Sequence, residues 1–420
     1  MKKGLFIIAA LFIGFSSFAQ KDRYRFAATY FGIEGEYIQE NNSFYYLNNS
    51  GNIDKKRLPS SISPRFLIGG THFWGHADFY ISIPIANIKL NNNSNASISN
   101  DVLTGFRLLP IRLKSNAFSP YIGIGFNSKE YSQKGANGKG PIYTNWQWYQ
   151  EIGLAYQAKK SAIIELGIRY FSANAYNSYI DRSTFKKTEV SPFSFSFSYK
   201  KVFDFTAGYS SENAKKYMAK VHKKAEKEGA LSAFSLGVGF SALIPLKKTE
   251  LASRHSFFND EIEGNLFPDL GIAYYSSPLD ASARLSFRPL KQKESAFDYT
   301  YELRRNSFAF EIFKFLGDYH GFVPFIGPYV SIDQYQLIET DHGEKIIDNI
   351  DTKLGYGVVF GWDIRQTKAD YLVLRTNLRY TPEFSYKKGK YRFTTEQIEF
   401  NFIQLVFYPE RYKVYKNLTQ

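Results

Sequence analysis

A two-residue alternation of apolar and polar side chains is the feature that most constrains the fold, and it recurs along the chain in segments of about ten residues. In 193–200, for example, four aromatic residues alternate with Ser194, Ser196, Ser198 and Lys200. Alternation with this period puts the two sets on opposite faces of a β-strand. The pattern predicts about sixteen strands, at 24–38, 61–71, 77–88, 100–114, 118–131, 145–157, 161–171, 189–203, 232–247, 264–275, 279–290, 305–315, 322–338, 353–365, 370–380 and 395–408.

The gaps between these segments are alternately short and long. Short gaps of turn-forming residues lie at 72–76, 115–117, 158–160, 276–278, 317–321 and 366–368. Long gaps lie between them and include the asparagine-rich 39–60 and 91–95. A barrel that spans a membrane has short turns on one side and long loops on the other, so the parity favours an antiparallel transmembrane β-barrel over a soluble all-β protein.

Composition agrees with a membrane barrel. The chain holds 39 Phe and 32 Tyr, yet its mean hydropathy is −0.33. Large rings suit a lipid-facing surface, while polar residues suit a lumen and loops. No apolar run beyond the N-terminus reaches the roughly 18 residues that a transmembrane helix needs.

An internal duplication divides the predicted strands into two sets of eight. Pro64, Pro84 and Pro120 recur as Pro268, Pro289 and Pro324, and Arg169-Tyr170 recurs as Arg379-Tyr380. Two architectures fit: one barrel of about sixteen strands from a duplicated unit, or two tandem eight-stranded barrels. We expect the single barrel, because many arginines fall at inward positions and charges are easier to keep in a wet lumen than in two packed interiors. The lumen-facing candidates are Arg107, Arg169, Arg284, Arg288, Arg365, Arg375 and Arg379.

The two sets of strands are preceded, joined and followed by segments that lack the strand pattern. Residues 1–19 have the charged, apolar and small-residue parts of a signal peptide, which predicts export and cleavage before Gln20. We expect the halves of the barrel at 20–205 and 232–410, a linker at 206–231 and a polar tail at 411–420.

The linker is predicted to be a basic helix on the periplasmic side. Ala214, Met218, Val221 and Ala225 share one helical face. Its lysines are docking candidates for anionic lipid or a protein partner, although a solvated connector would also carry them: Lys215, Lys216, Lys220, Lys223, Lys224 and Lys227.

Motifs for catalysis are missing from the sequence. It contains no G-x-S-x-G, H-E-x-x-H or phosphate-loop pattern and no cysteine, so neither an enzyme nor a cofactor is expected. His72 and His76 flank one short gap without a third ligand, which favours polar anchoring at the interface over a metal site.

The chain resembles Gram-negative outer-membrane β-barrel proteins in its alternating strands and its export signal. The end of that signal, Phe18-Ala19-Gln20, and the Asn-, Lys- and Tyr-rich composition are similar to those of Bacteroidota. The last strand departs from the usual terminal aromatic residue, since a polar tail follows Phe407-Tyr408-Pro409.

The resemblance implies location in the cell outer membrane, with outer-membrane lipid and lipopolysaccharide as partners and no nucleic acid. For function, the leading hypothesis is a pore or solute-uptake channel with a basic lumen. The alternatives are a non-conducting subunit or scaffold of a membrane protein complex for assembly, secretion or surface contact and, less favoured, an outer-membrane enzyme.

Overall fold

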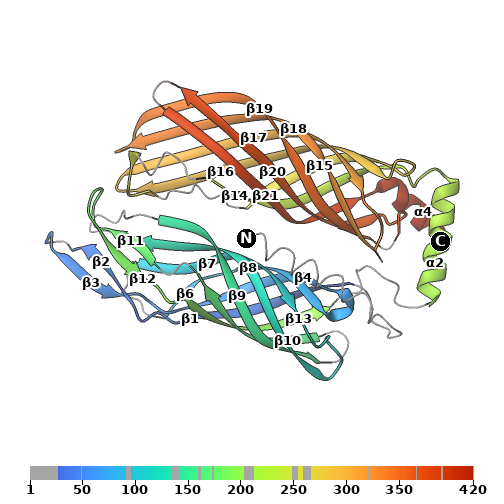
Figure 1. Cartoon of the computed structure of the whole chain (residues 1–420), viewed down its shortest axis with the longest axis horizontal. Helices are drawn as coiled ribbons and strands as arrows, with labels where there is room; N and C mark the ends of the chain where they lie inside the picture. Colours follow the sequence, from blue (N-terminus) through green and yellow to red (C-terminus); the bar gives the residue numbers. More distant parts are fainter. Residues whose placement is uncertain are drawn as a thin grey trace, which may run out of the picture.

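Two closed β-barrels lie side by side in the computed structural model (Figure 1). Neighbouring strands within each ring are antiparallel. The structure describes residues 27–419 except 49, 91–95, 134–139, 141, 159–161, 173–174, 203–211, 248–253, 259–265, 320, 366 and 389–390. The expected signal peptide and the start of the linker therefore lie outside the described residues.

Each barrel has eight strands. The first follows the order β1 (Ala28–Ile38), β4 (Ser61–His72), β5 (Ala77–Pro84), β7 (Ala96–Leu108), β8 (Ala117–Gln133), β9 (Ile142–Ala158), β10 (Ala162–Phe171) and β13 (Phe193–Val202), and β13 pairs back to β1. The second consists of β14 (Ala233–Pro245), β15 (Phe267–Ser276), β16 (Ala281–Ala296), β17 (Tyr299–Phe315), β18 (Phe322–Asp341), β19 (Glu344–Ile364), β20 (Leu372–Lys388) and β21 (Tyr391–Phe407), and β21 pairs back to β14.

The antiparallel barrel class and the duplicated eight-strand unit are confirmed, but the preference for one sixteen-strand barrel is wrong. Tyr30 of β1 pairs with Val202 of β13, which closes the first ring before the second begins. The matched prolines occupy equivalent strands in the two rings: Pro64 lies in the second strand of the first ring, as Pro268 does in the second ring.

The sixteen predicted strands correspond one to one with the barrel strands, but several continue far beyond their predicted ends. β18 has 20 residues and β19 has 21. The turn between them is only His342-Gly343, with φ of 48° and 85°. Two consecutive positive φ values are those of the tight I′ hairpin turn. The apolar alternation stops where the strands leave the membrane, so the sequence pattern predicted loops there.

The outer faces of both barrels are apolar and exposed, whereas the inner faces are polar and buried. On β13, Phe197 is 55% exposed while its neighbours Ser196 and Ser198 are buried. On β19 of the second barrel, Leu354 is 82% exposed. This apolar belt on a closed ring is the surface of a transmembrane barrel.

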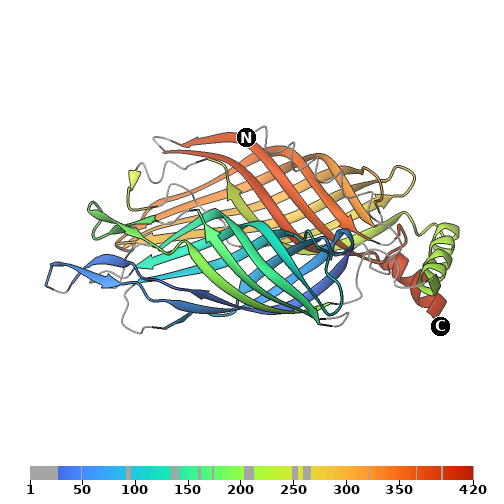
Figure 2. The same cartoon turned by 60° about the horizontal axis from the view of Figure 1, so that its bottom comes forward.

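Two helices lie together at one end of the molecule, which we call the helix end; the opposite end is the loop end (Figure 2). Helix α2 (Glu212–Lys227) belongs to the linker, and helix α4 (Pro409–Thr419) replaces the expected polar tail. At the end of α2, Gly229 has φ +72° and its N–H donates to the carbonyl of Glu226, while Ala230 N–H donates to that of Ala225. This pair of bonds is the Schellman motif, which requires a left-handed residue. Among the described residues, no helix combines the length and hydrophobicity that crossing a bilayer requires.

Two small hairpins extend from the first barrel at the loop end. They are β2 (Ser43–Leu47) with β3 (Ile53–Arg57), and β11 (Ala175–Tyr179) with β12 (Phe185–Glu189). A short β6 (Ile88–Lys89) pairs with the start of β4, and the one-turn η2 (Phe73–Gly75) connects β4 to β5 at the helix end.

Candidate functional site

The lumen of the first barrel contains a network of buried ion pairs. Arg107 donates to Glu151 Oε1 at 2.8 Å, to Glu165 Oε2 at 2.7 Å and to Asp78 Oδ2 at 3.3 Å. Lys200 Nζ lies 2.7 Å from both Asp78 Oδ2 and Glu165 Oε1. All five side chains are buried. Paired in this way, the charges satisfy one another without solvent.

Arg169 and Arg65 extend this network toward the loop end. Arg169 donates to Glu34 Oε2 at 2.6 Å and to Glu36 Oε1 at 3.2 Å. Arg65 donates to Glu36 Oε2 at 3.3 Å and to the carbonyl of Asn100 at 2.8 Å. Both guanidinium groups are fully buried. The network therefore crosses the lumen between strands on opposite sides of the ring.

The second lumen has an arrangement of the same kind with different residues. Arg379 donates to Asp269 Oδ2 at 2.9 Å and to Glu311 Oε1 at 2.8 Å. Arg284 contacts the same two carboxylates at 2.5 and 3.1 Å. Further along the barrel, Glu399 pairs with Arg288 and Arg305, and Asp363 accepts two bonds from Arg375 at 2.7 and 2.9 Å.

Toward the helix end, each lumen is also filled by apolar side chains. In the second barrel, Phe313, Phe315 and Phe325 pack together with buried valines from four strands. In the first, Tyr121 packs with Leu109, Leu113 and Ile163. Eight-stranded barrels have an interior just wide enough for side chains to fill, and here ionic and aromatic layers occupy both.

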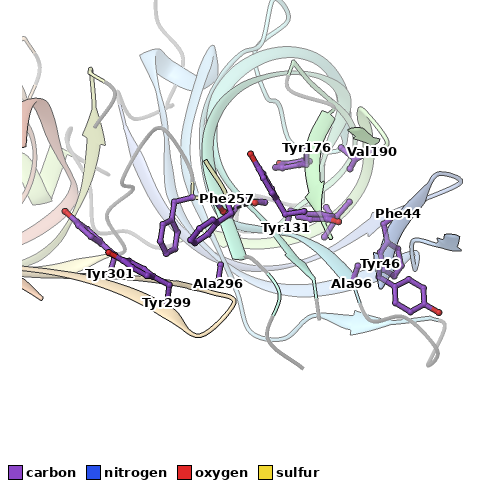
Figure 3. Close-up of a cluster of buried hydrophobic side chains, with 14 of the residues drawn as sticks. Phe44, Tyr46, Ala96, Tyr131, Tyr176, Val190, Phe257, Ala296, Tyr299 and Tyr301 are labelled. Atoms are coloured by element: carbon purple, nitrogen blue, oxygen red, sulfur yellow. Dashed lines mark hydrogen bonds between the residues drawn. The ribbon is translucent and has the colours of Figure 1, made fainter. Parts of the chain in front are cut away.

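A cluster of buried rings at the loop end joins the two barrels, and we call it the platform (Figure 3). Phe257 and Phe258, from the loop between β14 and β15, pack among rings of both barrels. Tyr143 of β9 donates its hydroxyl to the carbonyl of Phe257 at 2.9 Å. The platform comprises Phe44, Tyr46, Leu58, Ala96, Ile98, Tyr131, Tyr143, Tyr176, Tyr179, Val190, Phe257, Phe258, Ala296, Tyr299, Tyr301, Leu303, Leu337 and Ile347.

At the helix end, α4 packs over the mouth of the second barrel and α2 packs on α4. Arg411 of α4 is fully buried; it donates to the carbonyls of Leu231 at 2.8 Å and Asp370 at 3.1 Å. Its guanidinium lies 3.7 Å from the centre of the Tyr408 ring. Val221 and Ala225 of α2 are buried in one cluster with Val414 of α4.

No family model matches the chain. No curated protein matches it either.

Among solved structures, the chain is similar to Neisserial surface protein A at 14% identity, over 42% of this chain and 97% of that one, with a TM-score of 0.29. It is also similar to Ail, the attachment invasion locus protein of Yersinia pestis, at 11% identity over 41% and 97% of the two chains, with a TM-score of 0.26. An outer-membrane channel from Pseudomonas putida F1 matches at 9% identity over 92% and 98%, with a TM-score of 0.22.

The structure places all seven arginines proposed from the sequence inside a lumen, where each is at most 2% exposed. The preference for one wet lumen is wrong, because inward carboxylates that include Glu34, Glu36, Asp78, Asp269 and Glu399 pair with these arginines in two interiors. Arg365 differs from the other six: it lies 4.7 Å from the ring centre of Phe315 and 3.8 Å from Asp280 Oδ1, at the helix end.

The proposed docking lysines lie on α2. Lys216, Lys220, Lys223 and Lys227 are exposed and Lys224 is half-buried, whereas the side chain of Lys215 lies outside those described. Their helix buries Val221 and Ala225 against α4, so the apolar stripe contacts the chain itself. Within the described residues, no three His, Cys, Asp or Glu side chains are grouped to hold a metal ion.

Proposed function

We propose that this chain is an outer-membrane protein that conducts no solute and serves as a scaffold for contacts at the cell surface. The observation that carries the proposal is that ion pairs such as Arg107 with Glu165 and Arg379 with Glu311 cross the lumens. A water-filled pathway would have to separate these buried partners, which is unfavourable.

The orientation follows from the two ends of the barrels. Outer-membrane barrels have short turns in the periplasm and long extensions outside. We therefore assign the helix end, with its short connections and α2 and α4, to the periplasm, and the platform to the outer surface.

The platform supports a role in contact with a partner. It fixes the two hairpins of the first barrel beside the long hairpins of the second, so the two barrels present one surface. Two exposed lysines from different hairpins, Lys55 of β3 and Lys186 of β12, lie 5.9 and 4.8 Å from the ring centre of Tyr45. We propose that this basic edge binds a partner with an acidic surface.

Planar-bilayer recording of the refolded full chain tests the absence of a pore. We expect no stepwise conductance from protein whose incorporation is verified by heat-modifiable migration and by protease protection of the strands. Reproducible conductance steps from such protein would overturn the scaffold proposal in favour of a channel.

A cysteine-labelling experiment tests the orientation, because the chain contains no native cysteine. Lys345→Cys, at the β18–β19 hairpin, should react with an impermeant maleimide on intact cells. Lys413→Cys, in α4, should react only after the outer membrane is permeabilised. The reverse pattern would mean that the platform faces the periplasm.

Charge reversal tests the basic edge. Lys55→Glu with Lys186→Glu should reduce cross-linking of the chain to an acidic partner on intact cells, while Lys345→Glu, on a hairpin of the second barrel, serves as the control. Equal cross-linking in all three proteins would contradict docking at this edge.

A further inference from the structure

A cavity of about 260 Å³ lies between the two barrels, at the level of their apolar belts, and we call it the crevice. From the first barrel it is lined by residues that include Gly70, His72 and Thr104, and from the second by residues that include Trp362, Thr376 and Phe402. These residues belong to the outer faces of both barrels, so the crevice is separate from the lumens.

Small side chains on facing strands create this space. Most outward positions carry large residues, such as Phe66 of β4 and Phe360 of β19, which are 40% and 43% exposed. Thr104 of β7 is also an outward residue, since Leu103 and Gly105 on either side of it contact inward tyrosines, yet it is only 9% exposed. Close packing normally removes voids of this size from a protein interior.

The crevice is bounded at both ends by contacts between the barrels. At the helix end, the ring centres of Phe79 and Trp362 are 6.3 Å apart, and Ala27 packs with Phe322 and Ile364. At the loop end, the platform joins Tyr143 to Phe257. The barrels therefore touch above and below the crevice without filling it.

The lining selects an apolar occupant over water. Thr376 Oγ1 already donates to the carbonyl of Phe402 at 2.7 Å, and aromatic and aliphatic side chains form most of the remaining wall. A water molecule needs two to four polar partners, whereas an apolar cavity of about 150 Å³ suffices to bind benzene. The available volume thus fits a hydrocarbon chain.

We propose that the crevice holds an acyl chain of one phospholipid from the membrane leaflet at the helix end. The crevice opens among the lipid-facing surfaces of both barrels, where lipid is the surrounding solvent. His72, 9% exposed, lines the crevice and is the last residue of β4 at the helix end. The ester or phosphate group that follows such a chain would then lie near His72.

The chain's own N-terminal segment is a poorer occupant. Residues 20–26, which precede Ala27, include Lys21, Asp22, Arg23 and Arg25. Burying four charged side chains in an apolar crevice without partners is strongly unfavourable. The proposal concerns the membrane-facing surface and does not depend on the scaffold function.

Native mass spectrometry of the full mature chain in detergent tests the proposal. We expect one phospholipid to remain bound per chain after extensive delipidation. Thr104→Phe with Thr376→Leu fills the crevice and should reduce the retained lipid at least tenfold. Ala283→Leu, which adds apolar volume to an outward position of β16 that does not line the crevice, should retain it. Equal retention by the filled variant and the control would overturn the proposal.

A second measurement uses Trp362 as a reporter and remains informative if the double variant fails to fold. In a protein with Trp74, Trp146 and Trp148 replaced by Phe, a phosphatidylcholine with brominated acyl chains should quench Trp362 in detergent, with saturation near one equivalent. Thr376→Leu alone should weaken this quenching. Quenching that rises in proportion to lipid without saturating would identify ordinary boundary lipid, and absence of quenching would mean that the N-terminal segment or another group fills the crevice; either result contradicts the proposal.

Discussion

Arg182, in the turn between β11 and β12 of the first barrel, donates to both carboxylate oxygens of Asp341 in the second, with the Nη1–Oδ2 contact at 3.1 Å. The same guanidinium donates to the carbonyl of Phe297 at 2.6 Å. The two side chains are about a third exposed, at 37% and 30%. This ion pair, which we call the clasp, therefore joins the two barrels at the solvent-facing edge of the platform. The buried rings beneath it supply the apolar contact.

This clasp should weaken in acid. The hydrogen bond from Arg182 is the main cause that lowers the pKa of Asp341 below its usual value. A depressed carboxyl pKa stabilises the folded state at neutral pH, and that contribution is lost as the pH falls through the lowered value, below about 4. As an exposed pair, it should contribute about 0.5 kcal/mol.

Spin labels at Lys56→Cys and Lys345→Cys measure the effect, because they report the distance between hairpins of the two barrels. We expect the distance distribution to be modestly broader at pH 3 than at pH 7, and Arg182→Gln should have the broader distribution at both pH values. Lys353→Gln, which removes an ion pair with Asp351 inside one hairpin, is the control. An identical distribution for all proteins at both pH values would show that the clasp has no part in holding the hairpins.

Removing a lumen arginine should destabilise its barrel strongly. Arg379→Met leaves Asp269 and Glu311 buried with one partner fewer, and breaking a buried pair in this way costs about 3–5 kcal/mol. Arg304→Met, at an exposed outward position, should change the unfolding free energy by less than about 1 kcal/mol. Urea unfolding in lipid vesicles, followed by tryptophan fluorescence, compares the two. If both substitutions change the unfolding free energy by similar small amounts, the lumen is hydrated and the channel hypothesis is supported instead.

Arg411 should hold α4 and α2 at the mouth of the second barrel. Burial lowers its pKa from the ordinary arginine value, but it remains charged at neutral pH and makes its bonds to two backbone carbonyls. Arg411→Ala removes two bonds of a charged donor, worth about 1.5–3 kcal/mol each. Hydrogen exchange should show lost protection in 212–227 and 409–419, with the strands unchanged. Lys413→Ala, on the exposed face of α4, should leave both helices protected.

The exposed lysines of α2 should bind an anionic membrane surface and should not be needed for folding of the barrels. Replacing Lys216, Lys220, Lys223 and Lys227 by Gln should leave heat-modifiable migration unchanged, because the helix packs through Val221 and Ala225. Each lysine near an anionic membrane gains about 1 kcal/mol before screening. Binding of the α2 peptide to vesicles that contain phosphatidylglycerol should therefore weaken more than tenfold. Failure of the variant to assemble, together with unchanged vesicle binding, would make the lysines folding elements.

The features of this fold that could be predicted from the sequence are those that depend on residues close together in the chain. Alternation is local, so residues such as Phe197 and Ser198 were assigned to opposite faces from the sequence alone. Ring closure depends on residues that are far apart in the sequence. The alternation does not indicate whether the strand of Val202 pairs with the strand of Tyr30 or with a ninth strand. For this reason, the sequence led to the wrong prediction of the number of barrels.

The lumen contacts show the same division. The inward positions of the arginines followed from alternation, but the pairing of Arg169 with Glu34 and Glu36 of another strand did not. A complete count of acidic residues at inward positions would have indicated two paired interiors. The platform was missed because Phe257 and Tyr143 lie 114 positions apart, in segments that the sequence marks only as loops.

The first barrel should fold without the second. Its ring closes between β1 and β13, and the ion pairs described in its lumen join residues of this barrel. A fragment of residues 20–205 should give a heat-modifiable band after refolding, although with lower stability because it lacks the platform contacts of Phe257. A fragment that refolds only when 232–420 is added in trans would show that the rings close together.

Because each ring closes on itself, the chain has two seams, β1–β13 and β14–β21, and only the second includes a strand near the C-terminus. Assembly in the membrane thus requires two separate closing events, and the first must use a final strand that remains continuous with more than 200 downstream residues. A defect in either seam would leave the other ring intact. This chain can therefore stall halfway, with one finished barrel and one open one, a state that a single-ring protein does not have.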